Sequence, residues 1–477
     1  MLEYLLSLLL DFLDVILIII YLPICYLIGY QIRSRHPINP IYRKWFIKGL
    51  SAKLLGGLAF ALVYTFYYEY GGDTRSYYRD TLIVIDAFWE GPKVLWEVLH
   101  RSLQNVDTAS LDFSLRTKFK DPREYFVVNI TSIFTLLGLR SYFSATLLVA
   151  LFTYWGVWHF FLLMVSKFPK LEKQMAFAIL FVPSVFFWGS GISKDSFIFC
   201  GVGLILYHID IIFSGRFWNI KSLILIALAS YIMFTVKAYV LISLAPAIVL
   251  WRSLYLRDKI KSNFIRAAAL PVVAAVSLLS IVYTLDFLSE YNKKYSVDSF
   301  VNTAQSMQGW HYVEGENTSD KHGRGSSYTL GDYDADSWQG LLKIFPAAVN
   351  VTFFRPYFWE INGAAMLAQA IESFLLLLFT IVTLFRVGPL RIYRYISNDS
   401  LLLMCVIFAI FFGFAVGFSS YNFGALSRYK IPCVPFYVAS LFIIRHRYLE
   451  SKTLKREQFH EVRAKRRKMT SKVPQYA

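Results

Sequence analysis

Residues 400–419 read SLLLMCVIFAIFFGFAVGFS, a run of twenty residues without a charged side chain. A bilayer core about 30 Å thick is crossed by roughly 20 apolar residues in helical form. Similar runs recur along the 477 residues, of which 56% are hydrophobic and only 17% charged. Soluble domains are typically about 45–50% apolar and about 25% charged. The sequence therefore predicts an all-α, polytopic membrane protein.

The apolar windows predict eleven membrane-spanning helices, at residues 4–30, 47–70, 141–165, 174–192, 195–214, 221–236, 238–251, 265–285, 362–386, 400–419 and 430–445. The sixth and seventh windows are counted separately, because one long span would bury Lys237 in the membrane. Residues 125–139 are expected to form an interfacial or re-entrant helix. The first window lacks the features of a cleavable signal and is expected to remain as a span.

Lys and Arg together number 49, against 32 Asp and Glu. The excess gathers at residues 31–50, 252–266 and 386–398 and in the tail, 446–477. Cytoplasmic segments of membrane proteins carry such an excess, and all four fall on one side of the eleven-span arrangement. We therefore expect the N-terminus and two long loops, 71–126 and 286–361, outside and the tail in the cytoplasm. Long apolar runs separate the basic clusters, which indicates membrane lipid rather than nucleic acid as the partner.

The sequence gives little sign of a structural metal or of disulfides. Its four cysteines lie in apolar segments without CxxC spacing and are expected to be small core residues. The alternating carboxylates of GDYDAD, residues 331–336, leave a divalent cation open, although the later glutamate of an EF-hand is absent.

Functional residues are expected at the outer ends of the spans, because a charged side chain near hydrocarbon is costly unless it is used or paired. Asp73 follows two glycines after the second span, and Arg75 and Tyr77 come just behind it. Residues 74–104 then have the pattern of an amphipathic surface helix. Asp73 is either a functional carboxylate or merely a cap for that helix.

Two further places combine charge with a turn. The segment PSVFFWGSGISKD, Pro183 to Asp195, ends on Lys194 and Asp195 where a span begins outside. Ser193 as N-cap and the helix dipole explain Asp195 but leave Lys194 unexplained. Lys237 lies between two apolar runs and either snorkels to the interface or binds a phosphate.

Three other cations are expected on the outer side, against the positive-inside tendency. Arg355 lies among aromatic residues, which suits an interfacial anchor or a guanidinium presented to an anionic headgroup. Arg428 and Lys430 lie at the start of the last window, where they form either a snorkelling pair or part of a site.

The arrangement resembles the GT-C superfamily of polytopic glycosyltransferases, in the bacterial surface-polysaccharide branch. The features that carry the resemblance are the first-loop carboxylate Asp73, the surface helix, the Gly138-Leu139-Arg140-Ser141 segment before the third span, the Pro183 to Asp195 turn and the late Arg428-Tyr429-Lys430-Ile431-Pro432. Unlike an obvious paired-acid motif, Asp73 stands alone, and the chain has one extra leading span.

The resemblance implies sugar transfer from a polyprenyl-phosphate donor to a glycan or lipid-linked acceptor, outside a bacterial plasma membrane. Asp73 would be the general base and no cofactor would be required. The donor and acceptor would be bound by the polar residues gathered outside: Arg75, Tyr77, Lys194, Asp195, Lys237, Arg355, Arg428 and Lys430.

Two alternatives remain open at the level of sequence. The chain also resembles O-antigen polymerases, which join lipid-linked oligosaccharides and use outer arginines. A transporter or flippase is the non-enzymatic alternative, and it would place ionisable residues at mid-membrane on broken helices.

Overall fold

The computed structural model describes residues 2–68, 72–100, 121–215, 218–259, 327–330 and 338–470. The longer helices are α1 (Leu2–Ser34), α2 (Ile47–Phe66), α3 (Gly72–Glu90), α7 (Pro122–Leu137), α8 (Tyr142–Lys167), α11 (Lys194–Phe213), α12 (Ile220–Asp258), α15 (Trp338–Phe354), α16 (Ala364–Val387), α18 (Ser400–Ser420) and α20 (Val434–Thr470). The shorter ones are η1 (Tyr42–Phe46), α4 (Pro92–His100), η4 (Pro169–Leu171), α9 (Glu172–Ala176), η5 (Phe177–Phe181), α10 (Pro183–Trp188), η7 (Phe358–Glu360), α17 (Pro389–Ser397) and α19 (Phe423–Tyr429). These residues contain no β-strand, which confirms the all-α class.

Seven helical segments in the described part of the chain are long and apolar enough to cross a membrane. They are Phe12–Ser34, Tyr42–Phe66, Tyr142–Lys167, Lys194–Phe213, Ile220–Arg257, Ala364–Val387 and Ser400–Ser420. They indicate the polytopic membrane protein that the sequence predicts. The predicted number of eleven spans is not confirmed.

The differences between the eleven predicted windows and the seven candidate spans have local causes. The window 174–192 is not one helix but is divided among α9, η5 and α10. Pro183 lacks a backbone N–H, and Val182 before it is extended, so the helix breaks there. The window 430–445 becomes the first part of α20, which continues into the charged tail and is not among the candidate spans. The window 265–285 lies outside the described residues.

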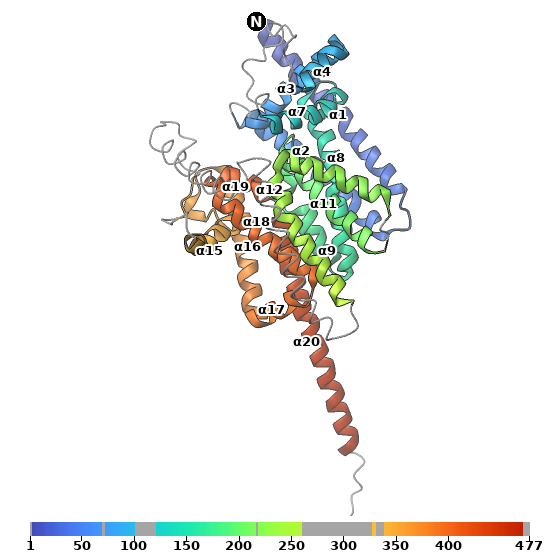
Figure 1. The fold of residues 1–477 in the computed structure, drawn as a ribbon, viewed down its shortest axis with the longest axis vertical. Helices are drawn as coiled ribbons and strands as arrows, with labels where there is room; N and C mark the ends of the chain where they lie inside the picture. Colours follow the sequence, from blue (N-terminus) through green and yellow to red (C-terminus); the bar gives the residue numbers. More distant parts are fainter. Residues whose placement is uncertain are drawn as a thin grey trace, which may run out of the picture.

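The two windows on either side of Lys237 belong to α12, which forms a single candidate span. Lys237 itself has the non-helical angles φ −147° and ψ 73°, so two helices meet at this residue. The two halves of α12 run in different directions (Figure 1). The predicted division at Lys237 is therefore a kink within α12.

Helices α3, α4 and α7 lie together at one end of the molecule, and the C-terminal part of α20 projects from the other (Figure 1). Residues 74–104, where the sequence predicts an amphipathic surface helix, form α3 and α4 as far as His100, with Gly91 between the two helices at φ +134°. Helix α3 buries Tyr77 and exposes Trp89. Residues 125–139 fall mainly in α7, which is shorter than the candidate spans.

The centre of the bundle is formed where α8 packs on α11. A Cβ added to Gly156 would come within 2.0 Å of the Cys200 carbonyl oxygen, so only glycine allows this approach. Small residues at such crossings are how helices associate closely in membranes. All four cysteines are free and buried, which confirms their prediction as core residues.

The two ends of α11 carry separate ionic clusters. Lys194 and Asp195 lie in its first turn. Near its last turn, Asp210 accepts from Lys167 at 2.7 Å and from Arg252 at 3.1 Å. The residues predicted to be outer and inner therefore lie at opposite ends of one helix.

Candidate functional site

Asp73 lies in the first turn of α3, directly after a sharp change of direction. Gly72 has φ +52°, and a Cβ there would meet the Tyr64 ring at 2.7 Å. Next to Asp73, the Thr74 hydroxyl is hydrogen-bonded to the Tyr142 hydroxyl at 3.0 Å, which fixes the start of α3 against α8. The Asp73 side chain is 48% exposed. A carboxylate is thus held on a rigid helix end while remaining accessible.

Asp195 lies in the first turn of α11, just after the segment that connects α10 to α11. Ser193 is extended and its hydroxyl accepts from the Ser196 amide, as predicted for an N-cap. The Ser196 hydroxyl in turn donates to the Gly191 carbonyl at 2.7 Å. These bonds fix the first turn of α11 and leave the Asp195 side chain only 2% exposed.

Lys237 reaches Asp195 from the kink of α12. Its ammonium lies 2.5 Å from Asp195 Oδ1 and 4.4 Å from the centre of the Tyr429 ring. The Lys237 side chain is 8% exposed. Lys237 is therefore a buried partner of Asp195, and of the two alternatives that the sequence leaves open for it, this burial contradicts snorkelling.

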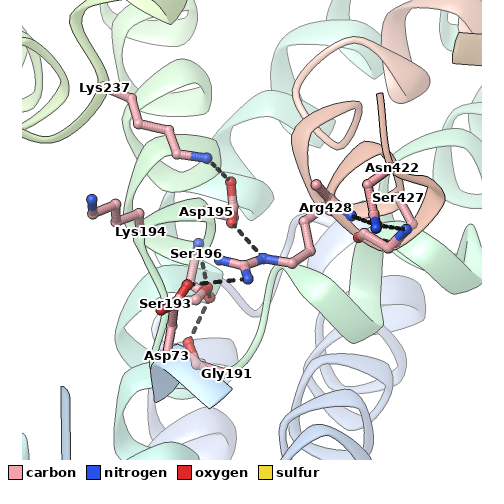
Figure 2. A network of polar contacts seen from close by, with 12 residues as sticks. Asp73, Gly191, Ser193, Lys194, Asp195, Ser196, Lys237, Asn422, Ser427 and Arg428 are labelled. Atoms are coloured by element: carbon pink, nitrogen blue, oxygen red, sulfur yellow. Dashed lines mark hydrogen bonds and ion pairs between the residues drawn. The ribbon is translucent and has the colours of Figure 1, made fainter. Parts of the chain in front are cut away.

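Arg428 joins this pair to Asp73. It lies on α19, whose N-cap Asn422 accepts from the amides of Gly424 and Ala425. Its Nε is 3.6 Å from Asp195 Oδ2 and its Nη1 is 3.5 Å from Asp73 Oδ2. Figure 2 shows Lys237, Asp195, Arg428 and Asp73 in a row of alternating charge. We call these four residues the charged row.

The charged row is electrostatically balanced and mostly enclosed. Burial alone would lower the pKa of Arg428, but the carboxylates around it, Asp195 foremost, outweigh burial and raise that pKa. Burial, followed by the charges of Glu124 and Asp73, raises the pKa of the Tyr77 phenol well above its ordinary value. Tyr77 is therefore a neutral neighbour of the row rather than a base.

Lys194 is next to Asp195 in sequence but does not join the row. Its ammonium lies 2.7 Å from Glu124 Oε1, on α7. In Figure 2 its side chain points away from Asp195 and Arg428. The predicted pair of Lys194 and Asp195 is thus divided between two ionic contacts.

The other predicted residues take different places. The Arg75 guanidinium lies over the Tyr142 ring at 4.7 Å, beside the start of α3. Arg355 is paired with Glu360 and lies between the rings of Tyr328 and Phe423. Arg355 is thus held among aromatic side chains, as an interfacial anchor would be.

Lys430 follows α19 and is also separate from the row. It is 2% exposed and is attracted by the charge of Glu372 on α16. Burial to this degree excludes the predicted snorkelling pair of Arg428 and Lys430. Arg428 instead belongs to the charged row, whereas Lys430 interacts electrostatically with Glu372.

The sequence analysis missed several ionisable residues with clear contacts, among them Asp210, which accepts from Lys167 and Arg252. Lys53 and Glu372 lie inside apolar windows, where any charge is a signal for function or pairing. Glu124 lies in the polar loop before α7 and gave no comparable signal. The segment GDYDAD lies outside the described residues. Among those described, no cluster of three or more His, Cys, Asp and Glu could hold a metal ion.

The charged row can bind and orient a polar ligand at Asp73 and Arg428. Asp73 offers a half-exposed proton acceptor, and Arg428 offers donors that suit carboxylate or phosphate oxygens.

No protein-family model, curated protein or solved structure matches this chain, so a functional assignment depends on the site itself.

Proposed function

We propose that this chain is an integral-membrane glycosyltransferase of a bacterial plasma membrane. It would move a sugar from a polyprenyl-phosphate-linked donor to an acceptor on the extracytoplasmic face. The observation that carries the proposal is the contact of half-exposed Asp73 with Arg428 at 3.5 Å, next to the buried pair of Asp195 and Lys237. A proton acceptor and a cation side by side are the two groups that such a transfer needs.

The proposed transfer is a single displacement at the anomeric carbon. Asp73 takes the proton of an acceptor hydroxyl as that oxygen forms its bond to the carbon. The bond from the carbon to the donor phosphate breaks, and its electron pair leaves with the polyprenyl phosphate. Arg428 stabilises the departing phosphate, and its effect is strengthened by burial because little water screens it.

The remaining residues have supporting roles in this proposal. Asp195 and Lys237 hold Arg428 in position, and the neutral Tyr77 and the ring-stacked Arg75 lie around the start of α3. Arg355 is paired with Glu360 and Lys430 is buried, so the donor phosphate is assigned to Arg428 alone.

The test is transfer by the purified full-length chain in proteoliposomes. The donors are a panel of polyprenyl-phosphate monosaccharides, and a lipid-linked oligosaccharide is included to detect polymerisation. We expect Asp73→Asn to lose activity by at least about a hundredfold, because general-base catalysis contributes roughly 10²–10⁴-fold. Asp86→Asn is the matched control, since Asp86 is an exposed carboxylate on the same helix, paired with Arg140 at 2.6 Å.

Full activity in Asp73→Asn would remove Asp73 from the mechanism. Activity only with the oligosaccharide donor would favour the O-antigen-polymerase alternative. Movement of lipid-linked sugar across the bilayer without any new glycosidic bond would favour a flippase.

A further inference from the structure

The turn that carries Asp195 is preceded by α10, and both ends of this short helix are held by charged side chains from other helices. After α10 ends at Trp188, residues 189–193 lead directly into α11. Only these five residues therefore connect α10 to the first turn of α11, where Asp195 lies.

Glu372 of α16 holds the first turn of α10. Its Oε2 accepts from the Ser184 amide at 2.8 Å, and its Oε1 accepts from the Ser184 hydroxyl at 2.5 Å. The amides in the first turn of a helix have no partner within it, so an outside carboxylate satisfies one of them.

Lys53 of α2 holds the other end. Its ammonium donates a hydrogen bond to the carbonyl of Gly189, the residue after α10. Lys53 is 4% exposed, and within the described ranges no carboxylate forms an ion pair with it. A buried ammonium without a counter-ion is expensive, whereas a methionine would fill the space at lower cost.

The surface of α2 is fitted to α10 around this contact. A Cβ on Gly56 would come within 2.2 Å of the Phe186 carbonyl oxygen, and one on Gly191 would overlap the Phe60 ring at 2.1 Å. Helix α10 and the turn after it thus pack directly on α2. Lys53 binds the residue that follows α10, and Glu372 binds the first turn of α10.

We propose that Lys53 and Glu372 are positioning residues that clamp α10 and thereby set the place of Asp195 in the charged row. Each acts through the backbone of α10 and neither touches the row itself. The inference concerns the geometry of the row and holds whatever reaction the row serves.

The test measures the protection of Lys237, which is buried against Asp195. The full-length chain in detergent is treated with an amine-reactive reagent, and labelling of each lysine is followed by mass spectrometry. We expect Lys53→Met and Glu372→Leu to raise the labelling rate of Lys237 several-fold, with the exposed Lys452 unchanged. Glu372→Gln, which keeps the size and one acceptor for Ser184, should have a much smaller effect.

Arg252→Met is the control for loss of a buried cation, because Arg252 is 4% exposed and pairs with Asp210 at the other end of α11. It should lower thermal stability without changing Lys237 labelling. Unchanged Lys237 labelling in both Lys53→Met and Glu372→Leu would overturn the clamp. So would a rise in the Lys237 labelling rate of Arg252→Met that equals the rise in those two variants.

Hydrogen–deuterium exchange of the wild-type peptide 183–193 provides a measurement that needs no variant. The backbone amides of this peptide should exchange slowly, and fast exchange would also overturn the clamp. None of these measurements needs a sugar donor. If labelling behaves as expected and no donor is used by the wild type, the clamp stands and the proposed glycosyltransferase falls.

Discussion

Replacing Asp195 by asparagine separates the structural part of the charged row from its reactive part. Asparagine has nearly the same shape as aspartate but no charge, so Lys237 and Arg428 would lose their common carboxylate. Asp73→Asn is the comparison, because Asp73 contacts the same arginine at almost the same distance, 3.5 Å against 3.6 Å. The two carboxylates differ in exposure, 48% for the Asp73 side chain and 2% for that of Asp195, and Asp195 also pairs with Lys237.

The exposure of each carboxylate determines how much stability its replacement costs. Two unit charges 3.6 Å apart attract by roughly 4–5 kcal/mol at an effective dielectric constant of about 20. Breaking a buried ion pair by removing one partner costs about 3–5 kcal/mol, because the remaining charge stays buried. An exposed pair contributes only about 0–1 kcal/mol. We therefore expect Asp195→Asn to destabilise the protein by several times more than Asp73→Asn.

The assay is denaturant unfolding of both variants in the same detergent. The double variant Asp195→Asn with Lys237→Met should recover part of the lost stability, since it removes one of the stranded cations. Equal loss in Asp195→Asn and Asp73→Asn would refute the reasoning. So would a double variant that is less stable than Asp195→Asn alone.

Three other predictions follow from particular contacts. Arg428→Ala should weaken apparent donor affinity more than it weakens folding, and unchanged affinity in transfer assays would count against phosphate binding there. Gly156→Val should destabilise by about 1–3 kcal/mol because its side chain would overlap the Cys200 carbonyl; a thermal unfolding temperature equal to that of wild type would contradict the close packing. A cysteine at Lys452 should react with a membrane-impermeant thiol reagent only from the cytoplasmic side, and labelling of intact cells would reverse the predicted orientation.

The sequence was a good guide to where charge is concentrated. The sequence predicts function at Asp73, Asp195, Lys237 and Arg428, because each lies at the end of an apolar run, where a charge must be used or paired. All four do meet, although Asp73 and Arg428 are 355 positions apart. Asp73, Asp195 and Arg428 lie at or beyond the ends of candidate spans, whereas Lys237 lies at the break within α12.

Which side chains meet within that layer could not be predicted in the same way. Successive residues of an α-helix point about 100° apart, so Lys194 and Asp195 must face different neighbours. Only the rotation of α11 against α7 and α12 decides that Lys194 meets Glu124 while Asp195 meets Lys237. That rotation depends on packing such as the Gly156 contact, which no local pattern encodes.

Asp195 explains how Arg428 can be both paired and available. Arg428 has one buried carboxylate neighbour, Asp195, and one half-exposed neighbour, Asp73. Lys237 also neutralises Asp195, so Asp195 remains paired when Arg428 turns part of its guanidinium toward a new anion. The contact given up is then the one with Asp73, whose exposed carboxylate water solvates at little cost. An incoming phosphate would thus release Asp73 from its cation at the moment when a free carboxylate is needed to accept a proton.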